Sequence, residues 1–216
     1  MSQSHRSNDI TSGVLHLIGV GLAIAVLVVL VIEGARHGSP WHIVSYTLYG
    51  TGLVLLYTAS ATYHLIHHQK VRLKHIFQRL DHAMIYILIA STYTPITFIA
   101  LEGGWRWSMF GIIWGIALFG FIVKIMWLKI PSWILTLLYP VMGWIIVIAF
   151  APLLEGMSTG TVWLLFTGGV SYTVGVFIYA LDHVFHPRKY FWMHEIFHLF
   201  VLGGSALHTI MMFYLL

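Results

Sequence analysis

The chain has 216 residues, of which 59% are hydrophobic and only 8% are charged, and its mean hydropathy is +0.86. About a quarter of the residues in a soluble domain are charged, so this composition excludes a water-soluble globular protein and indicates an integral membrane protein. The absence of cysteine excludes disulfides and thiolate metal sites. The sequence pI is near 9.4, which we attribute to loop charges that set the membrane orientation rather than to nucleic-acid binding.

The apolar residues occur in runs of about 20 residues, the length of a helix that crosses a bilayer, rather than in the short alternating segments of a β-barrel. We therefore expect an all-α integral membrane protein, in which one seven-helix transmembrane domain extends over 14–216. Residues 1–13 are expected to form a short polar tail. The expected spans are 14–32, 43–66, 80–100, 107–127, 132–151, 161–181 and 194–215.

Lysine and arginine are unevenly divided between the two sides of this predicted bundle. With a cytoplasmic N-terminus, nine of the eleven fall on the cytoplasmic side, and only Arg36 and Arg106 fall on the other. Because cytoplasmic loops carry an excess of Lys and Arg, we expect the N-terminus inside and, after seven spans, the C-terminus outside. This polarity is opposite to that of G-protein-coupled receptors and argues against a receptor of that class.

The last expected span begins with H-E-I-F-H, which places His194 and His198 four residues apart. Residues at this spacing share one face of a helix, so the two imidazoles can bind one metal ion. The predicted topology brings His64, near the end of the second span, and Asp81, at the start of the third, to the same cytoplasmic depth. Three imidazoles and a water form an ordinary catalytic zinc sphere. We therefore predict a Zn²⁺ site made by His64, His194 and His198.

Two further residues near this predicted site are the candidates for catalysis. Asp81 can accept a hydrogen bond from the water or from a ligand histidine, and so fix the geometry of the site. Ser60 lies one turn before His64, so its hydroxyl either bonds to the site or bonds back to a carbonyl of its own helix. The sequence leaves both interpretations of Ser60 open.

The other histidines have weaker interpretations. His208 lies about 21 Å along the helix from His194, too far to share its metal, so we expect a hydrogen-bonding role for it in the outer half of the bundle. His16 either approaches the cluster or packs as an ordinary polar residue. Asp182 and His186 are spaced as a helix-end pair. The histidines assigned to the headgroup region, without a special role, are His37, His42, His67, His68, His75 and His186.

H-E-I-F-H is also the short zincin pattern H-E-x-x-H, in which the glutamate acts as general base. An intramembrane zinc peptidase with Glu195 as its base is therefore an alternative. In the structural interpretation of the same residue, Glu195 faces the lipid headgroups. Bis-histidine haem fits the pattern less well, because its two ligands usually come from facing helices.

Three blocks of this sequence resemble the hemolysin III proteins, the bacterial branch of the progestin and adipoQ receptor (PAQR) family. They are S-A-T-Y-H at 60–64, R-L-D-H-A-M-I-Y-I-L-I-A-S-T-Y-T-P at 79–95 and H-E-I-F-H-L-F-V-L-G-G-S-A-L-H at 194–208. The resemblance covers nearly the whole chain. It implies a multi-pass protein of the bacterial cell membrane, with a zinc ion held by the three histidines named above and a water oriented by Asp81.

The chain departs from the family pattern in its first block. The family usually has a glutamate and an asparagine ahead of a histidine that His16 matches. Here Asp9 stands in place of the glutamate and Ser12 in place of the asparagine.

The resemblance also suggests a function, because the adiponectin-receptor relatives of this family look like zinc-dependent ceramidases. We therefore expect a zinc-dependent hydrolase of a lipid amide or ester, with membrane lipids as partners. Zinc lowers the pKa of bound water from about 15.7 to about 7, which suits hydrolysis. The alternatives are a non-enzymatic regulator or sensor of membrane homeostasis with a structural zinc, and a hemolysin-type cytolysin. The intramembrane zinc peptidase is less favoured.

Overall fold

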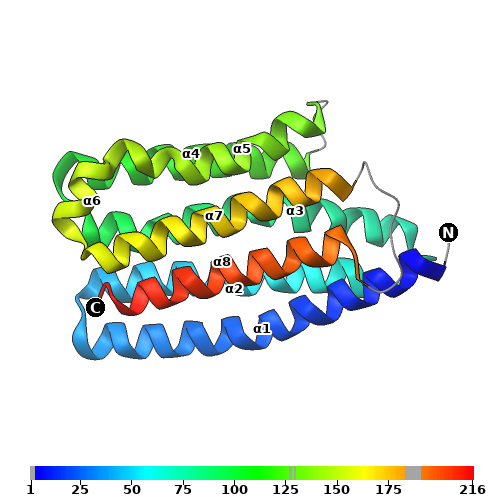
Figure 1. Ribbon diagram of the computed structural model, residues 1–216, viewed down its shortest axis with the longest axis horizontal. Helices are drawn as coiled ribbons and strands as arrows, with labels where there is room; N and C mark the ends of the chain where they lie inside the picture. The colour runs from blue at the N-terminus through cyan, green and yellow to red at the C-terminus, as the bar shows by residue number, and fades with distance from the viewer. Residues whose placement is uncertain (1–2, 127, 129, 183–190) are drawn as a thin grey trace.

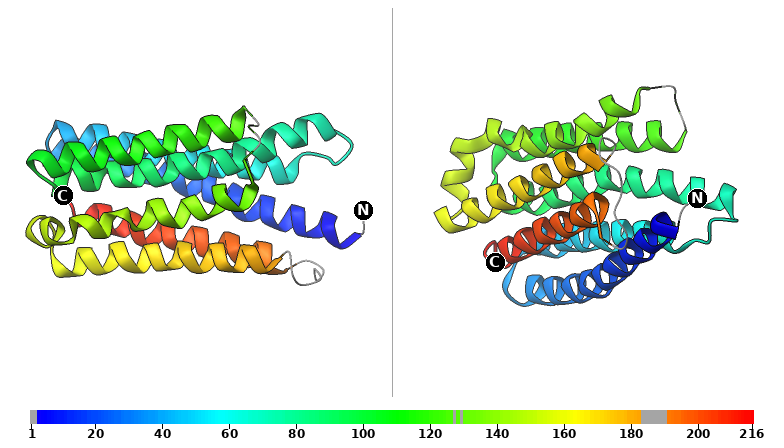
Figure 2. Two further views of the ribbon diagram at one scale, coloured as in Figure 1. Left: turned by 90° about the horizontal axis from the view of Figure 1, so that it is seen from above. Right: turned by 45° about the vertical axis from the view of Figure 1, so that its right-hand side comes forward.

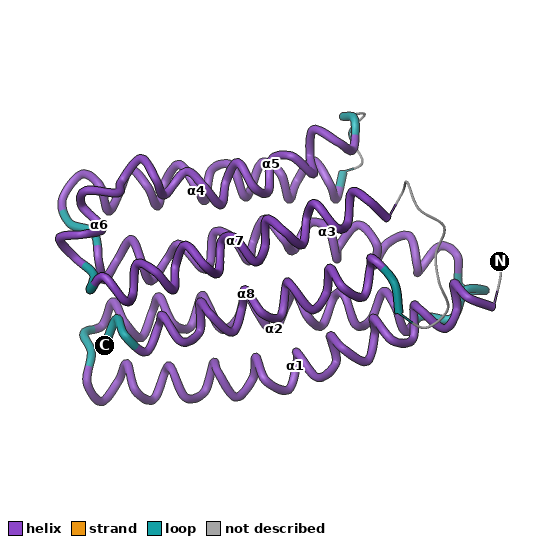
Figure 3. Tube along the Cα trace, viewed as in Figure 1, coloured by secondary structure: helices purple, strands orange, loops and turns teal. Residues whose placement is uncertain are grey.

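The computed structural model describes residues 3–126, 128, 130–182 and 191–216, which form helices and turns and no strand (Figures 1 and 3). A π-helical segment (Ile96–Ala100) continues α3, and a 3-10 segment (Ile145–Ala149) joins α5 to α6, so the described helices form seven rods. The expectation of an all-α, seven-helix protein is confirmed. The helices are α1 (Gln3–His37), α2 (Pro40–Leu65), α3 (Val71–Pro95), α4 (Gly103–Ile125), α5 (Ser132–Trp144), α6 (Phe150–Gly156), α7 (Thr159–Asp182) and α8 (Met193–Phe213).

The seven rods lie side by side along the long axis of the molecule (Figures 1 and 2). Helix α1 packs against α2 and α8, α2 packs against α3, and α7 packs against α8. The two ends of the chain lie at opposite ends of the bundle (Figure 1), as an odd number of crossings requires. The end of the bundle that holds the N-terminus also holds the end of α2 and the starts of α3 and α8.

Six of the rods are long and apolar enough to cross a membrane. Among the described helices, α2 does not meet this criterion. Helix α2 has 26 residues, but its sequence is rich in Ser, Thr and Tyr. Its buried face lies inside the bundle, where the hydroxyl groups of three tyrosines find partners on α8. A span surrounded by protein does not need the apolar surface that a lipid-facing span needs.

Tyrosines of α2 bond across to α8. The Tyr46 hydroxyl donates to the Met212 carbonyl at 2.7 Å, and the Tyr57 hydroxyl donates to Ser205 Oγ, also at 2.7 Å. All three of α2's buried tyrosines, Tyr46, Tyr49 and Tyr57, reach backbone or side-chain oxygens of α8. Interhelical hydrogen bonds of this kind hold helices together where lipid supplies no hydrophobic driving force. They fix α8, which carries two of the predicted metal ligands, against α2, which carries the third.

A tyrosine of α3 stabilises the break between α5 and the 3-10 segment. The Tyr93 hydroxyl lies 2.8 Å from the carbonyl oxygens of both Met142 and Gly143, and it accepts a hydrogen bond from the Ile146 amide at 2.9 Å. Irregular backbone inside a membrane is tolerated only where protein groups satisfy it. Tyr93 does so here, and the rod therefore continues through α6.

Helix α1 differs from the expectation for residues 1–13, because it begins at Gln3 rather than near residue 14. Polar residues of this first part of the helix have partners on other helices: Asp9 bonds to His64, and Ser12 bonds to Glu195. These contacts explain why the segment is helical and not a loose tail. The separate tail is therefore not seen in the described residues.

Among the described residues, the lysines and arginines near the helix ends lie at the ends of the bundle that the topology predicts. Lys70 and the first turns of α3, with Arg72 and Lys74, lie at the end of the bundle that holds the N-terminus, whereas Arg36 ends α1 at the other end. A cytoplasmic location for the N-terminal end stays a prediction. The predictions for His186, Lys129, Arg188 and Lys189 concern positions outside the described residues.

Candidate metal centre

Three imidazoles meet at the N-terminal end of the bundle. One comes from the end of α2 (His64), and two come from the first turns of α8 (His194 and His198). One nitrogen from each lies within 4.8 Å of the corresponding nitrogen of the other two. His64 and His198 are buried and His194 is partly buried, so the group is a built cluster and not a chance meeting of surface side chains.

The distance between the His64 and His194 nitrogens matches the distance between two ligands of a tetrahedral ion. The Nε2 atoms of His64 and His194 are 3.3 Å apart, and the ring centroids of His194 and His198 are 4.6 Å apart. Zinc–nitrogen bonds of about 2.0–2.1 Å in tetrahedral geometry separate the ligand nitrogens by about 3.3 Å. The Nδ1 atom of His198 is buried without a hydrogen-bond partner in the described part of the chain. The three side chains therefore fit the zinc ion that the sequence predicts.

Asp9 fixes the orientation of His64. Its Oδ1 accepts a hydrogen bond from His64 Nδ1 at 3.0 Å, while its Oδ2 lies 2.7 Å from Lys74 Nζ and 3.4 Å from His68 Nε2. Because Nδ1 donates to the carboxylate, the lone pair of His64 is on Nε2, the atom that faces His194. A carboxylate behind a ligand histidine is the usual support of a zinc site. The sequence predicts a headgroup location without a special role for His68, but the structure joins His68 to this network.

Helix α1 also holds the start of α8. The Ser12 hydroxyl donates to Glu195 Oε1 at 2.9 Å, the Trp192 amide donates to Glu195 Oε2 at 2.7 Å, and the Ser12 backbone bonds to His198. Glu195 is 1% exposed, so it does not face lipid headgroups as the structural interpretation expected. Both carboxylate oxygens serve as acceptors at the helix start, which gives Glu195 a structural role.

His16 and Ser60 lie beside the cluster. The His16 ring stacks on the His198 ring, with centroids 3.9 Å apart, so His16 does approach the cluster. Both ring nitrogens of His16 and the Ser60 hydroxyl are buried without a partner in the described residues. Ser60 therefore does not bond back to its own helix, which was one of its two predicted roles.

Asp81 lies on α3 and lines the cavity that adjoins the cluster. Its carboxylate is partly buried and lies 3.6 Å from the neighbouring His82 Nδ1. Asp81 is not part of the three-histidine group, but it lines the same cavity as His194, His198 and Ser60. The structure thus brings His64, His194 and His198 together and places Asp81 and Ser60 on the wall of the adjoining cavity, and the catalytic roles of these two residues stay a prediction.

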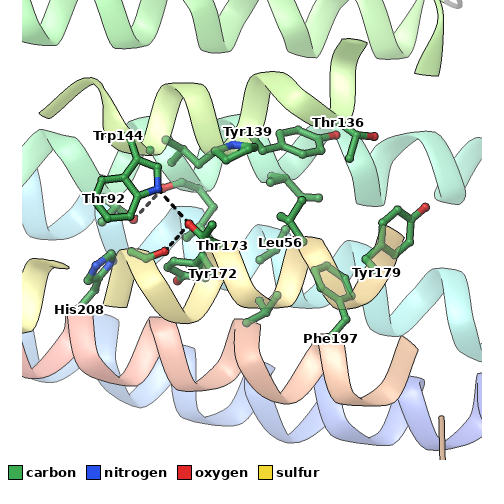
Figure 4. Close-up of a pocket in the computed structure, with 18 of the residues that line it drawn as sticks. Leu56, Thr92, Thr136, Tyr139, Trp144, Tyr172, Thr173, Tyr179, Phe197 and His208 are labelled. Atoms are coloured by element: carbon green, nitrogen blue, oxygen red, sulfur yellow. Dashed lines mark hydrogen bonds between the residues drawn. The ribbon is translucent and has the colours of Figure 1, made fainter. Parts of the chain in front are cut away.

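The cluster lies at one end of a cavity of about 140 Å³ that is lined by residues of α2, α3, α5, α7 and α8. The close-up in Figure 4 shows its wall, with Tyr179 and Phe197 toward the cluster and Trp144 and His208 toward the other end. Most of the wall is aliphatic or aromatic. The cavity therefore suits a long apolar ligand.

The cavity is not fully closed on the side where α5 and α7 lie next to each other. This line of contact between α5 and α7 is called the seam. Lining residues on both helices are partly or fully exposed. They are Thr136, Pro140 and Gly143 on α5, and Gly169, Thr173 and Val176 on α7. Trp144 Nε1 donates to Thr173 Oγ1 at 3.0 Å and bridges the seam at one point.

The contacts of Asp9, Ser12 and Lys74 at the cluster were not predicted from the sequence. The signal was present, because Asp9 and Ser12 occupy the positions of the family's glutamate and asparagine ahead of His16. His208 behaves as predicted, since its Nε2 bonds to the Leu165 carbonyl at 3.0 Å and it lies far from the cluster.

The fold and the site define a multi-pass helical membrane protein with a histidine cluster inside its bundle. The family model described as "Haemolysin-III related" matches residues 4–209, and the chain belongs to this family. It is therefore a multi-pass protein of a bacterial membrane, as the sequence predicted.

Individual relatives agree with this assignment. The chain is 40% identical over 199 residues to "Hemolysin-3" of Bacillus cereus, covering 92% of this chain and 87% of the relative. It is 42% identical over 199 residues to "Hemolysin-3 homolog" of Bacillus subtilis (strain 168), covering 92% and 89%. A more distant relative in the PAQR family is the human "Monocyte to macrophage differentiation factor", 28% identical over 174 residues, with 78% of this chain and 68% of the relative covered.

Proposed function

We propose that this protein is a zinc-dependent hydrolase that cleaves an amide or ester of a membrane lipid, and that the lipid reaches the site from the cytoplasmic leaflet. The observation that carries this proposal is the position of the histidine cluster at the end of a mostly apolar cavity inside the bundle. A site that is polar at one point and apolar elsewhere suits a substrate with one reactive polar group and a long chain.

His64, His194 and His198 are the proposed ligands. A zinc ion bound there would act as a Lewis acid toward a carbonyl and lower the pKa of water. Asp9 holds His64 in the tautomer whose Nε2 faces the other ligands. Helix α8 supplies its two ligands from one face, and the Ser12–Glu195 hydrogen bond keeps that face turned toward α2.

Asp81 and Ser60 are the proposed catalytic residues. The Asp81 carboxylate, on the cavity wall, orients the attacking water and accepts its proton at Oδ1 or Oδ2. The buried Ser60 hydroxyl has no partner in the described residues, so it is free to donate a hydrogen bond to the substrate's polar group. Hydrolysis then yields a fatty acid and an amine or alcohol.

The alternatives fit the geometry less well. A purely structural zinc is typically enclosed by four protein ligands, whereas the described cluster supplies three and contacts the cavity through His194 and His198. The peptidase alternative needs Glu195 as general base, but both of its oxygens accept hydrogen bonds from Ser12 and Trp192. Both observations favour the lipid hydrolase.

The proposal is tested by replacing Asp81 with asparagine. Asp81→Asn should keep zinc, because Asp81 is outside the ligand group, but should lower the release of fatty acid from vesicles that contain amide- and ester-linked lipids by about 10²-fold or more. Glu102→Gln, at an exposed carboxylate beyond the far end of the bundle, is the matched control and should behave as the unchanged protein. Undiminished fatty-acid release by Asp81→Asn would refute the role given to this residue.

A further inference from the structure

The far end of the cavity holds a second polar group that the proposed reaction does not use. His208 is on α8, ten residues beyond His198, so the two lie about 15 Å apart along the helix. It is 5% exposed and lines the same cavity as the histidine cluster. An imidazole inside a membrane protein is costly unless it has a partner or a function.

One edge of the His208 ring is anchored to α7. Nε2 donates to the Leu165 carbonyl at 3.0 Å. A Cβ atom on Gly168 would overlap the Nε2 and Cδ2 atoms of the ring, so glycine at this position lets the ring lie directly against the α7 backbone. The orientation of the His208 ring is thus fixed by the space beside Gly168, which a side chain at residue 168 would fill.

The other ring nitrogen of His208, Nδ1, can act only as a hydrogen-bond acceptor. Because Nε2 carries the hydrogen that bonds to a carbonyl, Nδ1 of the neutral ring carries a lone pair and can only accept. Nδ1 is turned away from Gly168 and is buried without a partner in the described part of the chain. A buried acceptor without a partner is destabilising, and a phenylalanine or leucine at this position would avoid that cost.

We infer that His208 is a second binding subsite, which accepts a hydrogen bond from a hydroxyl group on the chain of a lipid held at its other end by the histidine cluster. The distance of about 15 Å from His198 is about the length of an extended acyl chain of twelve carbons. The ligand class is therefore a long-chain lipid with a hydroxyl group near the middle of its chain. This inference rests on the proposed function, since it requires lipid to enter the cavity.

The test compares the binding of three fatty acids to the purified, zinc-loaded protein in lipid nanodiscs. The probes are stearate, stearate with a hydroxyl group on its twelfth carbon, and stearate with a hydroxyl group on its second carbon. Only the hydroxyl on the twelfth carbon should reach His208. It should strengthen binding by about three- to tenfold over stearate, the effect of one net hydrogen bond, and the hydroxyl on the second carbon should not.

His208→Phe removes the acceptor and should abolish this gain while it retains the binding of stearate itself. Equal binding of the three acids to the unchanged protein, or the same gain in His208→Phe, would overturn the second subsite and leave the proposed hydrolase intact. Failure of all three acids to bind would overturn both. If His208→Phe does not accumulate, the comparison of the two hydroxyl positions in the unchanged protein decides the question alone.

Discussion

The Asp9 carboxylate and the His64 imidazole form a hydrogen bond of 3.0 Å between α1 and α2, 55 positions apart in the sequence. This bond makes the first helix part of the candidate metal centre, although the helix supplies none of its three histidines. It also explains why this chain has an acidic residue, Asp9, at the position where the family has a glutamate. The position keeps its carboxylate although the side chain is one methylene shorter.

Replacing Asp9 should therefore weaken metal binding. Asp9→Ala removes the acceptor for His64 Nδ1 and should lower zinc affinity about 10- to 100-fold, measured by competition with a chelator. Asp9→Glu, with the family's own residue, should restore most of the affinity. Glu33→Ala, which removes a carboxylate from the other end of α1, is the control and should leave the affinity unchanged. Wild-type affinity in Asp9→Ala would contradict the positioning role.

Ser60 and Ser205 make a pair that separates function from stability. The Ser60 hydroxyl is buried and has no partner in the described residues, whereas Ser205 Oγ accepts from Tyr57 at 2.7 Å. Ser60→Ala should leave thermal stability equal or higher, because it removes an unsatisfied group, and should lower turnover about tenfold. Ser205→Ala should destabilise the protein by about 1–3 kcal/mol, because it leaves a buried tyrosine hydroxyl without its acceptor.

Thermal unfolding in detergent and fatty-acid release measure the two effects. A large loss of stability in Ser60→Ala, with turnover reduced only in proportion to the folded protein, would show that Ser60 is a packing residue.

Glu195→Gln tests the peptidase alternative directly. Glutamine has the same shape and keeps an acceptor for the Trp192 amide and a partner for the Ser12 hydroxyl. We therefore expect turnover within about twofold of the unchanged protein, since loss of a general base costs about 10²- to 10⁴-fold. Hydrolysis is measured as release of fatty acid from lipid vesicles. A drop of that larger size would transfer the role of base from Asp81 to Glu195.

Much of the fold could be predicted because membrane helices have a simple sequence signal. Long apolar runs predicted the seven helices, and the i, i+4 spacing of His194 and His198 predicted that the two imidazoles lie on one face of the last helix. The depth of His64 followed from the topology alone. These features depend on local sequence or on the direction of each span.

The parts that sequence did not predict depend on contacts between distant segments. Asp9 and Ser12 looked like a polar tail, and only the packing of α1 against α2 and α8 reveals their partners. Helix α2 is the converse case. Its tyrosines and threonines make it a weak span by composition, but α8 satisfies several of its hydroxyls.

The central claim is that His64, His194 and His198 bind one zinc ion, and metal analysis of the detergent-purified protein tests it most directly. The protein should carry about one zinc per chain, and the double variant His194→Ala/His198→Ala should carry none. A double variant of two headgroup histidines, His37→Ala/His75→Ala, should retain the metal. Absence of metal from the unchanged protein, or its retention in His194→Ala/His198→Ala, would contradict the metal centre and with it the proposed hydrolase.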